Sequence, residues 1–217
     1  MYRVIDIETE NTGTDVMKDN KRILSVQIGD DAIQDLYWAD SLEPQWKLES
    51  AKNKIASLLS QGVIFAGYNI KGFDVPFLRE FLGVRIPETN TLDLCLCQEQ
   101  KLKGITGRNR PRLEEACEAC GITVTHKQKM NDKAKEYTSI EDVKNRALAK
   151  AKELVKRRGW SHGFSYNYVL DKISGGIAIY NAYLEFVKTG GQKNTLFYEY
   201  AIGDVISEYR LLRALGY

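Results

Sequence analysis

Residues 4–9, Val-Ile-Asp-Ile-Glu-Thr, place two carboxylates inside an otherwise apolar, β-branched run. Such runs favour strands, and strand side chains alternate between two faces, so Ile5 and Ile7 face one side while Asp6 and Glu8 face the other. Two carboxylates on one face of an apolar strand repel each other and are costly to bury. The pattern predicts either an edge strand with a solvated acidic face or a site for a divalent cation, which binds several oxygen ligands.

The segments that follow predict a mixed sheet with helices packed on it. Strands are expected at 23–28 and 32–38 around a tight turn, and a buried strand is expected at 63–66. Between them, a helical stripe is formed by Leu48, Ile55, Leu58 and Leu59. Short connections predict that the first three strands form an antiparallel meander. The order of strands and helices indicates the α/β class.

Composition bounds the class of protein. The chain has 217 residues and 43% hydrophobic content, which predicts one sizeable globular domain, or one domain with a large insertion. No apolar run approaches the ~20 residues of a membrane span, and the start lacks the pattern of a secretory signal. We therefore expect no membrane partner.

The four cysteines are Cys95, Cys97, Cys117 and Cys120. Four cysteines in a chain of this length do not resemble a disulfide scaffold, which indicates a reducing, cytoplasmic location. A zinc site of the form Cys-x-Cys followed by Cys-x-x-Cys is the alternative. Because both pairs lie in apolar or amphipathic segments, buried thiols are the favoured interpretation.

The formal net charge of +2 hides an asymmetry. Residues 101–158 contain sixteen Lys/Arg and eight Asp/Glu, a net of +8, so the remainder carries −6. An acidic part that holds candidate metal ligands and a basic part that could follow a polyanion are typical of an enzyme acting on nucleic acid. A lysine-rich, solvated helix face accounts for some of these charges.

A third carboxylate stands in residues 67–78, Gly-Tyr-Asn-Ile-Lys-Gly-Phe-Asp-Val-Pro-Phe-Leu. Pro76 belongs in the first turn of a helix, and Gly83 ends that helix. Its apolar stripe is Phe77, Leu78, Phe81 and Leu82. Asp74 therefore lies at the N-terminal edge of the helix, either as an N-cap or as a carboxylate delivered to the end of the sheet.

Near the carboxyl terminus, residues 198–205 read Tyr-Glu-Tyr-Ala-Ile-Gly-Asp-Val. Asn194 or Thr195 can cap a helix that runs to about residue 215. Tyr200 and Asp204 are four residues apart, so both project from one face. Glycine within a helix costs ~1 kcal/mol relative to alanine, so Gly203 suggests a close approach there. An ordinary amphipathic helix is the alternative.

These three motifs carry a family resemblance. Residues 6–9 resemble the first motif of the DEDD (DnaQ-like) 3′–5′ exonuclease superfamily, and residues 69–77 resemble the second. The pattern Tyr-Asn-x-x-x-Phe-Asp-x-Pro-Phe at residues 68–77 is most similar to the corresponding motif in the proofreading exonuclease domain of family B DNA polymerases. Tyr200 and Asp204 match the Tyr-x-x-x-Asp of the tyrosine-type (DEDDy) subclass.

The resemblance covers about residues 1–124 and 194–217. It implies a single exonuclease domain over 1–217 with a ribonuclease H-like fold, a mixed central sheet flanked by helices. A largely helical, basic insertion at about 125–193 precedes the catalytic helix.

The resemblance also implies a site and a reaction. The catalytic set is Asp6, Glu8, Asp74, Tyr200 and Asp204, whose four carboxylates bind two divalent cations, Mg²⁺ or Mn²⁺, with Asp6 bridging them. Tyr200 orients the attacking water, and Thr9, Asn69 and Phe73 are expected to contact the terminal nucleotide. No catalytic role is assigned to Asp93, Asp171 or Tyr198. The expected activity releases nucleoside 5′-monophosphates from 3′ ends of single-stranded DNA, with RNA as an alternative substrate and a DNA polymerase or repair complex as the partner.

Two other functions stay open. The histidine-type subclass of exoribonucleases carries His-x-x-x-x-Asp, and His126 precedes Asp132 one residue too far away for that spacing. His126 is otherwise an ordinary surface histidine in a lysine-rich loop. A catalytically silent ribonuclease H-like module that only binds nucleic acid is the other alternative, although all four carboxylates are present.

The insertion has its own pattern. Ser139 is expected to cap a helix to residue 158, with a buried stripe of Ile140, Val143, Ala147, Ala151 and Leu154. Aromatic or histidine side chains then recur at every second position from 160 to 168, which favours a half-buried strand; a stacking platform for unpaired bases is the alternative. Gly175-Gly176 is expected to separate this segment from an apolar helix at 177–187.

Overall fold

The computed structural model describes residues 1–10, 22–39, 46–97 and 99–217, without the side chains of 46–47 and 96–101. These residues form two compact units. The first unit consists of Met1–Glu8, Ile23–Thr125 and Glu199–Tyr217. The second consists of His126–Tyr198 and the described ends of the segment Thr9–Arg22.

A five-stranded sheet organises the first unit. Its strands are β1 (Tyr2–Thr9), β2 (Ile23–Gly29), β3 (Gln34–Trp38), β4 (Ile64–Gly67) and β5 (Thr91–Asp93), in the spatial order β3-β2-β1-β4-β5. The strand β2 is antiparallel to β3, whereas β4 is parallel to both β1 and β5. The prediction of a mixed sheet in the α/β class is therefore confirmed.

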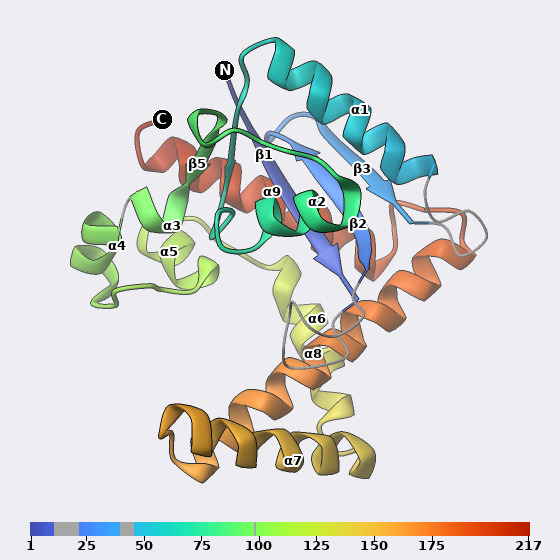
Figure 1. Cartoon of the computed structure of the whole chain (residues 1–217), viewed down its shortest axis with the longest axis vertical. Helices are drawn as coiled ribbons and strands as arrows, with labels where there is room; N and C mark the ends of the chain where they lie inside the picture. Colours follow the sequence, from blue (N-terminus) through green and yellow to red (C-terminus); the bar gives the residue numbers. More distant parts are fainter. Residues whose placement is uncertain (11–21, 40–45, 98) are drawn as a thin grey trace. The chain divides into compact units, whose positions relative to one another are not determined.

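Helices cover both faces of this sheet. They are α1 (Trp46–Ser60), α2 (Asp74–Leu82), α3 (Leu94–Cys97), α4 (Glu99–Thr106), α5 (Leu113–Ala119) and the part of α9 (Leu196–Ala214) that begins at Glu199, with a short 3₁₀ helix at Glu88–Asn90. In Figure 1, α1 and α2 lie on the viewer's side of the sheet and α9 passes behind β1.

Burial of β2 shows the consequence of this layering. Every residue of the strand is buried, the polar Ser25 and Gln27 included. Strands covered on both faces lose the alternation of apolar and polar residues, and buried polar groups then need partners of their own. The Gln27 side-chain amide donates a hydrogen bond to the Ser25 hydroxyl at 2.5 Å.

The second unit is helical, with α6 (His126–Tyr137), α7 (Glu141–Arg158) and α8 (His162–Lys188). The strand predicted at 160–168 is wrong, because α8 begins there with Ser161 as its N-cap. The Ser161 hydroxyl accepts the Phe164 N–H at 3.3 Å. Ser165, Val169 and Ile173 recur at the helical spacing and are buried. The aromatic alternation was misleading because positions four apart satisfy a period of two and also lie on one helical face.

Other local predictions also need correction. α8 runs continuously through Gly175-Gly176, so these glycines do not separate two elements. The N-cap of α7 is Ile140, which is 44% exposed, and the Ser139 hydroxyl donates instead to the Glu136 carbonyl at 2.9 Å. His126 begins α6, so it does not lie in a loop. Within the described ranges, we find no helix with the length and apolar character to cross a membrane.

Candidate metal centre

Asp6 and Glu8 lie on β1, which runs between β2 and β4 in the middle of the sheet. The alternative of an edge strand is therefore wrong. Ile5 and Ile7 are buried on the opposite face, as the alternation predicts. Asp6 is half-buried and Glu8 is 8% exposed, so water does not fully compensate their charges.

α9 brings a third carboxylate to this face. At its start, the Thr195 hydroxyl accepts the Tyr198 N–H at 3.4 Å, as expected for a cap. Asp204 is buried, and one ligand oxygen from each of Asp6, Glu8 and Asp204 lies within 4.8 Å of the others. Residues from opposite ends of the chain thus meet, and these three carboxylates could hold a metal ion.

Asp74 reaches the same strand from a different direction. It is the first residue of α2, and its Oδ1 accepts the backbone N–H of Ile7 at 3.1 Å. The N-cap of α2 is Phe73, whose side chain makes no capping bond, so the N-cap interpretation of Asp74 is wrong. Burial, followed by the neighbouring Asp6 charge, raises the pKa of Asp74 well above its ordinary value.

The turn before α2 explains how Asp74 is held. Asn69 adopts a left-handed φ of 65°, which asparagine tolerates better than most residues. A Cβ on Gly72 would lie 2.5 Å from the Asn69 Oδ1, so a larger residue there would displace the exposed Asn69 side chain. The buried Asp93 carboxylate accepts backbone N–H groups from Asn69, Lys71 and Cys95 at 3.1–3.2 Å. Asp93 is thus engaged in supporting the turn, consistent with the absence of a catalytic assignment.

Glu208 is a carboxylate that the motifs do not identify. It is 4% exposed, and it lies four residues beyond Asp204 on α9. The Tyr68 backbone N–H donates to its carboxylate, while its Oε2 has no hydrogen-bond partner among the described residues. Burial and the charges of Asp6, Asp74 and Asp204 raise the pKa of Glu208 well above its ordinary value. The continued four-residue spacing of Tyr200, Asp204 and Glu208 is the sequence signal that could have revealed it.

Tyr200 shares this electrostatic environment. Its ring is half-buried, and burial together with the charges of Glu8 and Asp204 raises the pKa of its hydroxyl well above the ordinary value. After burial, the charge of Asp6 contributes to raising the pKa values of all three groups, Asp74, Tyr200 and Glu208. A concentration of buried negative charge is the environment in which a divalent cation is most strongly stabilised. The donor set, hard carboxylate oxygens, suits Mg²⁺ or Mn²⁺.

The remaining predicted residues are placed as follows. Thr9, the last residue of β1, is buried. Asn69 is exposed, and the half-buried Phe73 ring packs on Phe77 with a centroid separation of 4.8 Å. His126 belongs to the second unit, whereas Tyr200 belongs to the unit that holds the carboxylates.

The cysteines whose side chains are described are Cys95, Cys117 and Cys120, and none of the three forms a disulfide. Cys95 and Cys117 are buried, which agrees with the interpretation as core residues. None of the three joins a metal-ligating group of the described residues. Cys97 ends α3, but its side chain lies outside the described residues.

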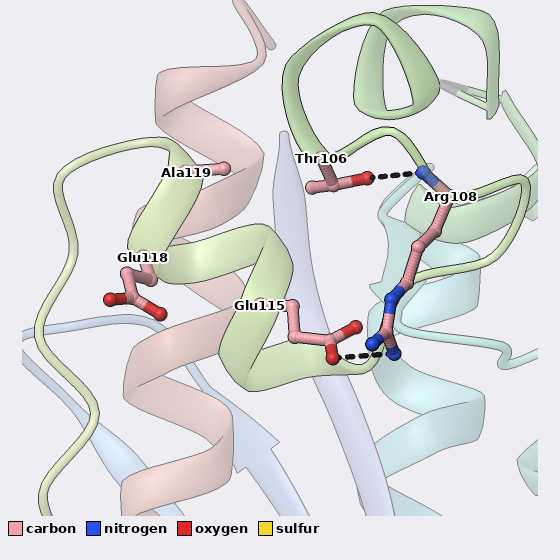
Figure 2. Close-up of a pocket in the computed structure, with 5 residues that line it drawn as sticks. All are labelled: Thr106, Arg108, Glu115, Glu118 and Ala119. Atoms are coloured by element: carbon pink, nitrogen blue, oxygen red, sulfur yellow. Dashed lines mark hydrogen bonds and ion pairs between the residues drawn. The ribbon is translucent and has the colours of Figure 1, made fainter.

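A pocket elsewhere in the first unit has a volume of about 350 Å³. Its lining does not include Asp6, Glu8, Asp74, Asp204 or Glu208. Figure 2 shows its lining residues Thr106, Arg108, Glu115, Glu118 and Ala119. Arg108 pairs with Glu115 at 2.6 Å, and its backbone N–H is bonded to the Thr106 hydroxyl at 3.2 Å. These groups satisfy one another, so we assign the pocket no function.

The fold is therefore α/β, and its candidate site is a carboxylate cluster able to hold a metal ion. No protein-family model and no curated protein matches the chain. Among solved structures, the chain is similar to the family B DNA polymerase from the hyperthermophilic archaeon Pyrobaculum calidifontis. This match has a TM-score of 0.40 and 16% sequence identity, and it covers 92% of this chain but 27% of the polymerase chain. Function is therefore inferred from the site itself.

Proposed function

We propose that this chain is a divalent-metal-dependent 3′–5′ exonuclease that releases nucleoside 5′-monophosphates from single-stranded DNA. The observation that carries the proposal is the convergence of Asp6, Glu8 and Asp204, with ligand oxygens within 4.8 Å of one another. Asp74, bonded to the backbone between Asp6 and Glu8, supplies the fourth carboxylate of the motif set. The mixed sheet with helices on both faces is consistent with a ribonuclease H-like fold.

In this proposal, Asp6, Glu8, Asp74 and Asp204 would hold two Mg²⁺ or Mn²⁺ ions. Bound cations of this kind lower the pKa of water and neutralise charge that develops on a phosphodiester and its leaving oxygen. The carboxylates stay ionised when cations compensate their repulsion. Thr9, Asn69 and Phe73 are assigned to contacts with the terminal nucleotide.

Tyr200 acts in this proposal as a hydrogen-bonding group. Its raised pKa keeps the proton on the phenol oxygen at neutral pH, so the hydroxyl orients the attacking water and does not remove a proton from it. The proximity of Tyr200 to Glu8 and Asp204 supports the tyrosine-type assignment over one based on His126.

The experiment is cleavage of a 3′-hydroxyl, 5′-labelled single-stranded oligonucleotide with Mn²⁺, with Mg²⁺ and with EDTA. We expect stepwise shortening from the 3′ end that EDTA abolishes, and Asp6→Asn or Asp74→Asn should reduce it by at least about a hundredfold. Asp35→Asn is the matched control, because Asp35 is half-exposed and pairs with Lys54 at 3.1 Å. An RNA of the same sequence tests the alternative substrate.

Folding is checked separately, because loss of activity alone would not identify a metal site. Removing one of several clustered carboxylates relieves repulsion, so the melting temperature of metal-free Asp6→Asn should hold or rise. Cleavage that survives EDTA or the Asp6 substitution would contradict the proposal. Mn²⁺ binding without cleavage on either substrate would instead support a silent nucleic-acid-binding module.

A further inference from the structure

In the second unit, the turn that joins α7 and α8 presents aromatic side chains. Gly159 ends α7 with a left-handed φ of 66°, and Ser161 caps α8, so the two helices follow one another with a very short connection (Figure 1). Immediately beyond this turn, Phe164 is 58% exposed and Tyr168 is 38% exposed. These two rings lie on one face of α8, because they are four residues apart.

The aromatic side chains form an ordered cluster, which we call the aromatic tip and define as Trp160, Phe164 and Tyr168. The Phe164 and Tyr168 rings lie 6.4 Å apart with an interplanar angle of 20°. Trp160 contacts both rings edge-on, at 5.1 Å and 5.4 Å. Trp160 also packs against the core between α7 and α8, which includes Val143, and therefore anchors the two exposed rings.

Cations surround the aromatic tip. The Arg158 guanidinium lies 4.8 Å from the centroid of the Trp160 ring, and the Lys172 ammonium lies 5.9 Å from that of Tyr168. Stacked rings with cations beside them offer both a π-face and positive charge within one surface.

The basic side chains of α7 are ion-paired in its first part and unpaired toward its C-terminal end, among the described residues. In its first part, Lys144, Arg146 and Lys150 pair with acidic residues of the same helix at 3.9, 3.7 and 2.7 Å. Toward the aromatic tip, the exposed side chains of Lys152, Lys156, Arg157 and Arg158 have no ion-pair partner among the described residues. Cations without internal partners remain available to an external anion.

We propose that the aromatic tip and the unpaired cations of α7 form a binding site for single-stranded nucleic acid. Unpaired bases stack on Phe164 and Tyr168, and phosphates of the same strand bind the side chains of Lys152, Lys156, Arg157 and Arg158. Exposed rings flanked by cations match a ligand that alternates planar bases with phosphates. A duplex hides its bases, so it offers the rings nothing to stack on.

An anionic membrane surface is the competing occupant, since aromatic and basic residues also gather on membrane-bound helices. Such helices insert a broad apolar face, whereas Phe164 and Tyr168 are neighboured by the polar, exposed His162 and Asn167. The ordered packing of the rings favours stacking. The inference stands apart from the proposed nuclease activity, because it concerns strand binding in a different unit of the chain.

The test measures binding by fluorescence anisotropy in EDTA, so that cleavage does not contribute. The probes are labelled dT20, an abasic strand with the same number of phosphates, and a blunt duplex of 20 base pairs. We expect dT20 to bind more tightly than the abasic strand. Phe164→Ala and Tyr168→Ala should each weaken dT20 binding by about 5- to 150-fold, the range for loss of one stacking contact, and should leave binding of the abasic strand unchanged.

The basic residues are distinguished by salt dependence. Lys156→Gln or Arg157→Gln should lower the slope of log affinity against log salt by about 0.7 each, because one phosphate contact is lost from a single strand. Lys144→Gln is the matched control, since Lys144 pairs with Glu141 on the same helix. Ile140→Ala is the control for exposed apolar surface, because Ile140 is 44% exposed at the other end of α7. Asp171→Asn should tighten binding, since Asp171 is exposed next to Lys172.

The outcomes separate the alternatives. If Phe164→Ala unfolds the unit by circular dichroism, Phe164→Leu keeps apolar bulk but removes the π-face and should still weaken dT20 binding. Unchanged dT20 affinity in folded Phe164→Leu and Tyr168→Leu variants would overturn the proposal. So would binding to vesicles of 30% phosphatidylserine that depends on Phe164 when dT20 binding does not. Neither result would affect cleavage at the carboxylate site, so the two proposals fail independently.

Discussion

Glu208 illustrates at the scale of a single residue how burial and charge act together. The carboxyl group is buried beside Asp6, Asp74 and Asp204, and its pKa is raised well above the ordinary glutamate value of 4.5. The folded chain therefore binds this proton more tightly than the unfolded chain. Below about pH 4.5 the group is neutral in both states, and stability is lost as the pH rises from there toward the folded pKa.

We therefore predict that Glu208→Gln stabilises the metal-free protein. Glutamine keeps an acceptor for the Tyr68 N–H but carries no charge. The melting temperature should rise by several degrees at pH 8 and by little near pH 4.5, measured by differential scanning calorimetry in EDTA. Glu199→Gln, in the exposed first turn of the same helix, is the control. An equal gain at both pH values would show that charge is not the cause.

Tyr200 provides a second test at this scale. Tyr200→Phe removes one hydroxyl and keeps the ring, so the saturated cleavage rate should fall by roughly ten- to a thousandfold while Mn²⁺ affinity stays constant. Asp204→Asn should cost more, because it weakens the ligand set. His126→Ala should leave the rate unchanged. A large loss in His126→Ala together with a normal rate in Tyr200→Phe would show that the tyrosine-type assignment is wrong.

At the scale of elements, glycines serve opposite purposes at the end of β2 and in the interior of α8. A Cβ on Gly29 would lie 2.8 Å from the backbone Cα of Gln34, across the turn from β2 to β3. A Cβ on Gly175 would meet no atom within 4 Å. The first glycine is required by close packing, whereas the second weakens its helix through backbone entropy.

The two glycines should therefore respond oppositely to alanine. Gly175→Ala should raise the free energy of unfolding by about 0.5–1 kcal/mol, the difference in helix propensity. Gly29→Ala should lower it, because the added methyl meets backbone atoms that can separate only if the turn between β2 and β3 shifts. Urea unfolding followed by circular dichroism measures both variants, and each serves as the other's control. Destabilisation by Gly175→Ala would mean that its helix packs more closely there.

At the scale of the whole molecule, negative charge collects in the first unit and positive charge in the second. Burial, followed by the repulsion among the carboxylates of the first unit, raises the pKa values of Asp74 and Glu208. Stability of the metal-free protein should therefore decline as the pH rises above about 4.5, when these groups would ionise in the unfolded chain.

Cations should reverse this decline. Mn²⁺ binds the folded state and competes with protons for the same carboxylates, so its stabilising effect should be larger at pH 8 than at pH 5. Thermal melting in Mn²⁺ and in EDTA at both pH values measures the effect. Asp6→Asn should lose most of the Mn²⁺-dependent shift. A shift of equal size in Asp6→Asn would place the ion somewhere else.

Local patterns predicted much of the first unit. Alternation in residues 4–9 was enough to assign the faces of Asp6 and Glu8, and the positions of Pro76 and Gly83 were enough to bound α2. These predictions succeeded because each depends on neighbours along the chain. The strand predicted at 160–168 failed because helical and strand periods coincide at positions four apart. Burial of Val169 and Ile173 in one cluster with residues of α7 is consistent with the helix.

The sequence by itself determined the candidate residues for the proposed chemistry: carboxylates on β1, at the start of α2 and on α9, and a hydroxyl one helical turn before Asp204. Only the tertiary structure decided how these groups meet. It placed β1 in the centre of the sheet, directed Asp74 to the Ile7 N–H, and buried Glu208 beside the others. The physical reason is that burial and mutual repulsion depend on distances between segments far apart in the chain, which local periodicity does not encode.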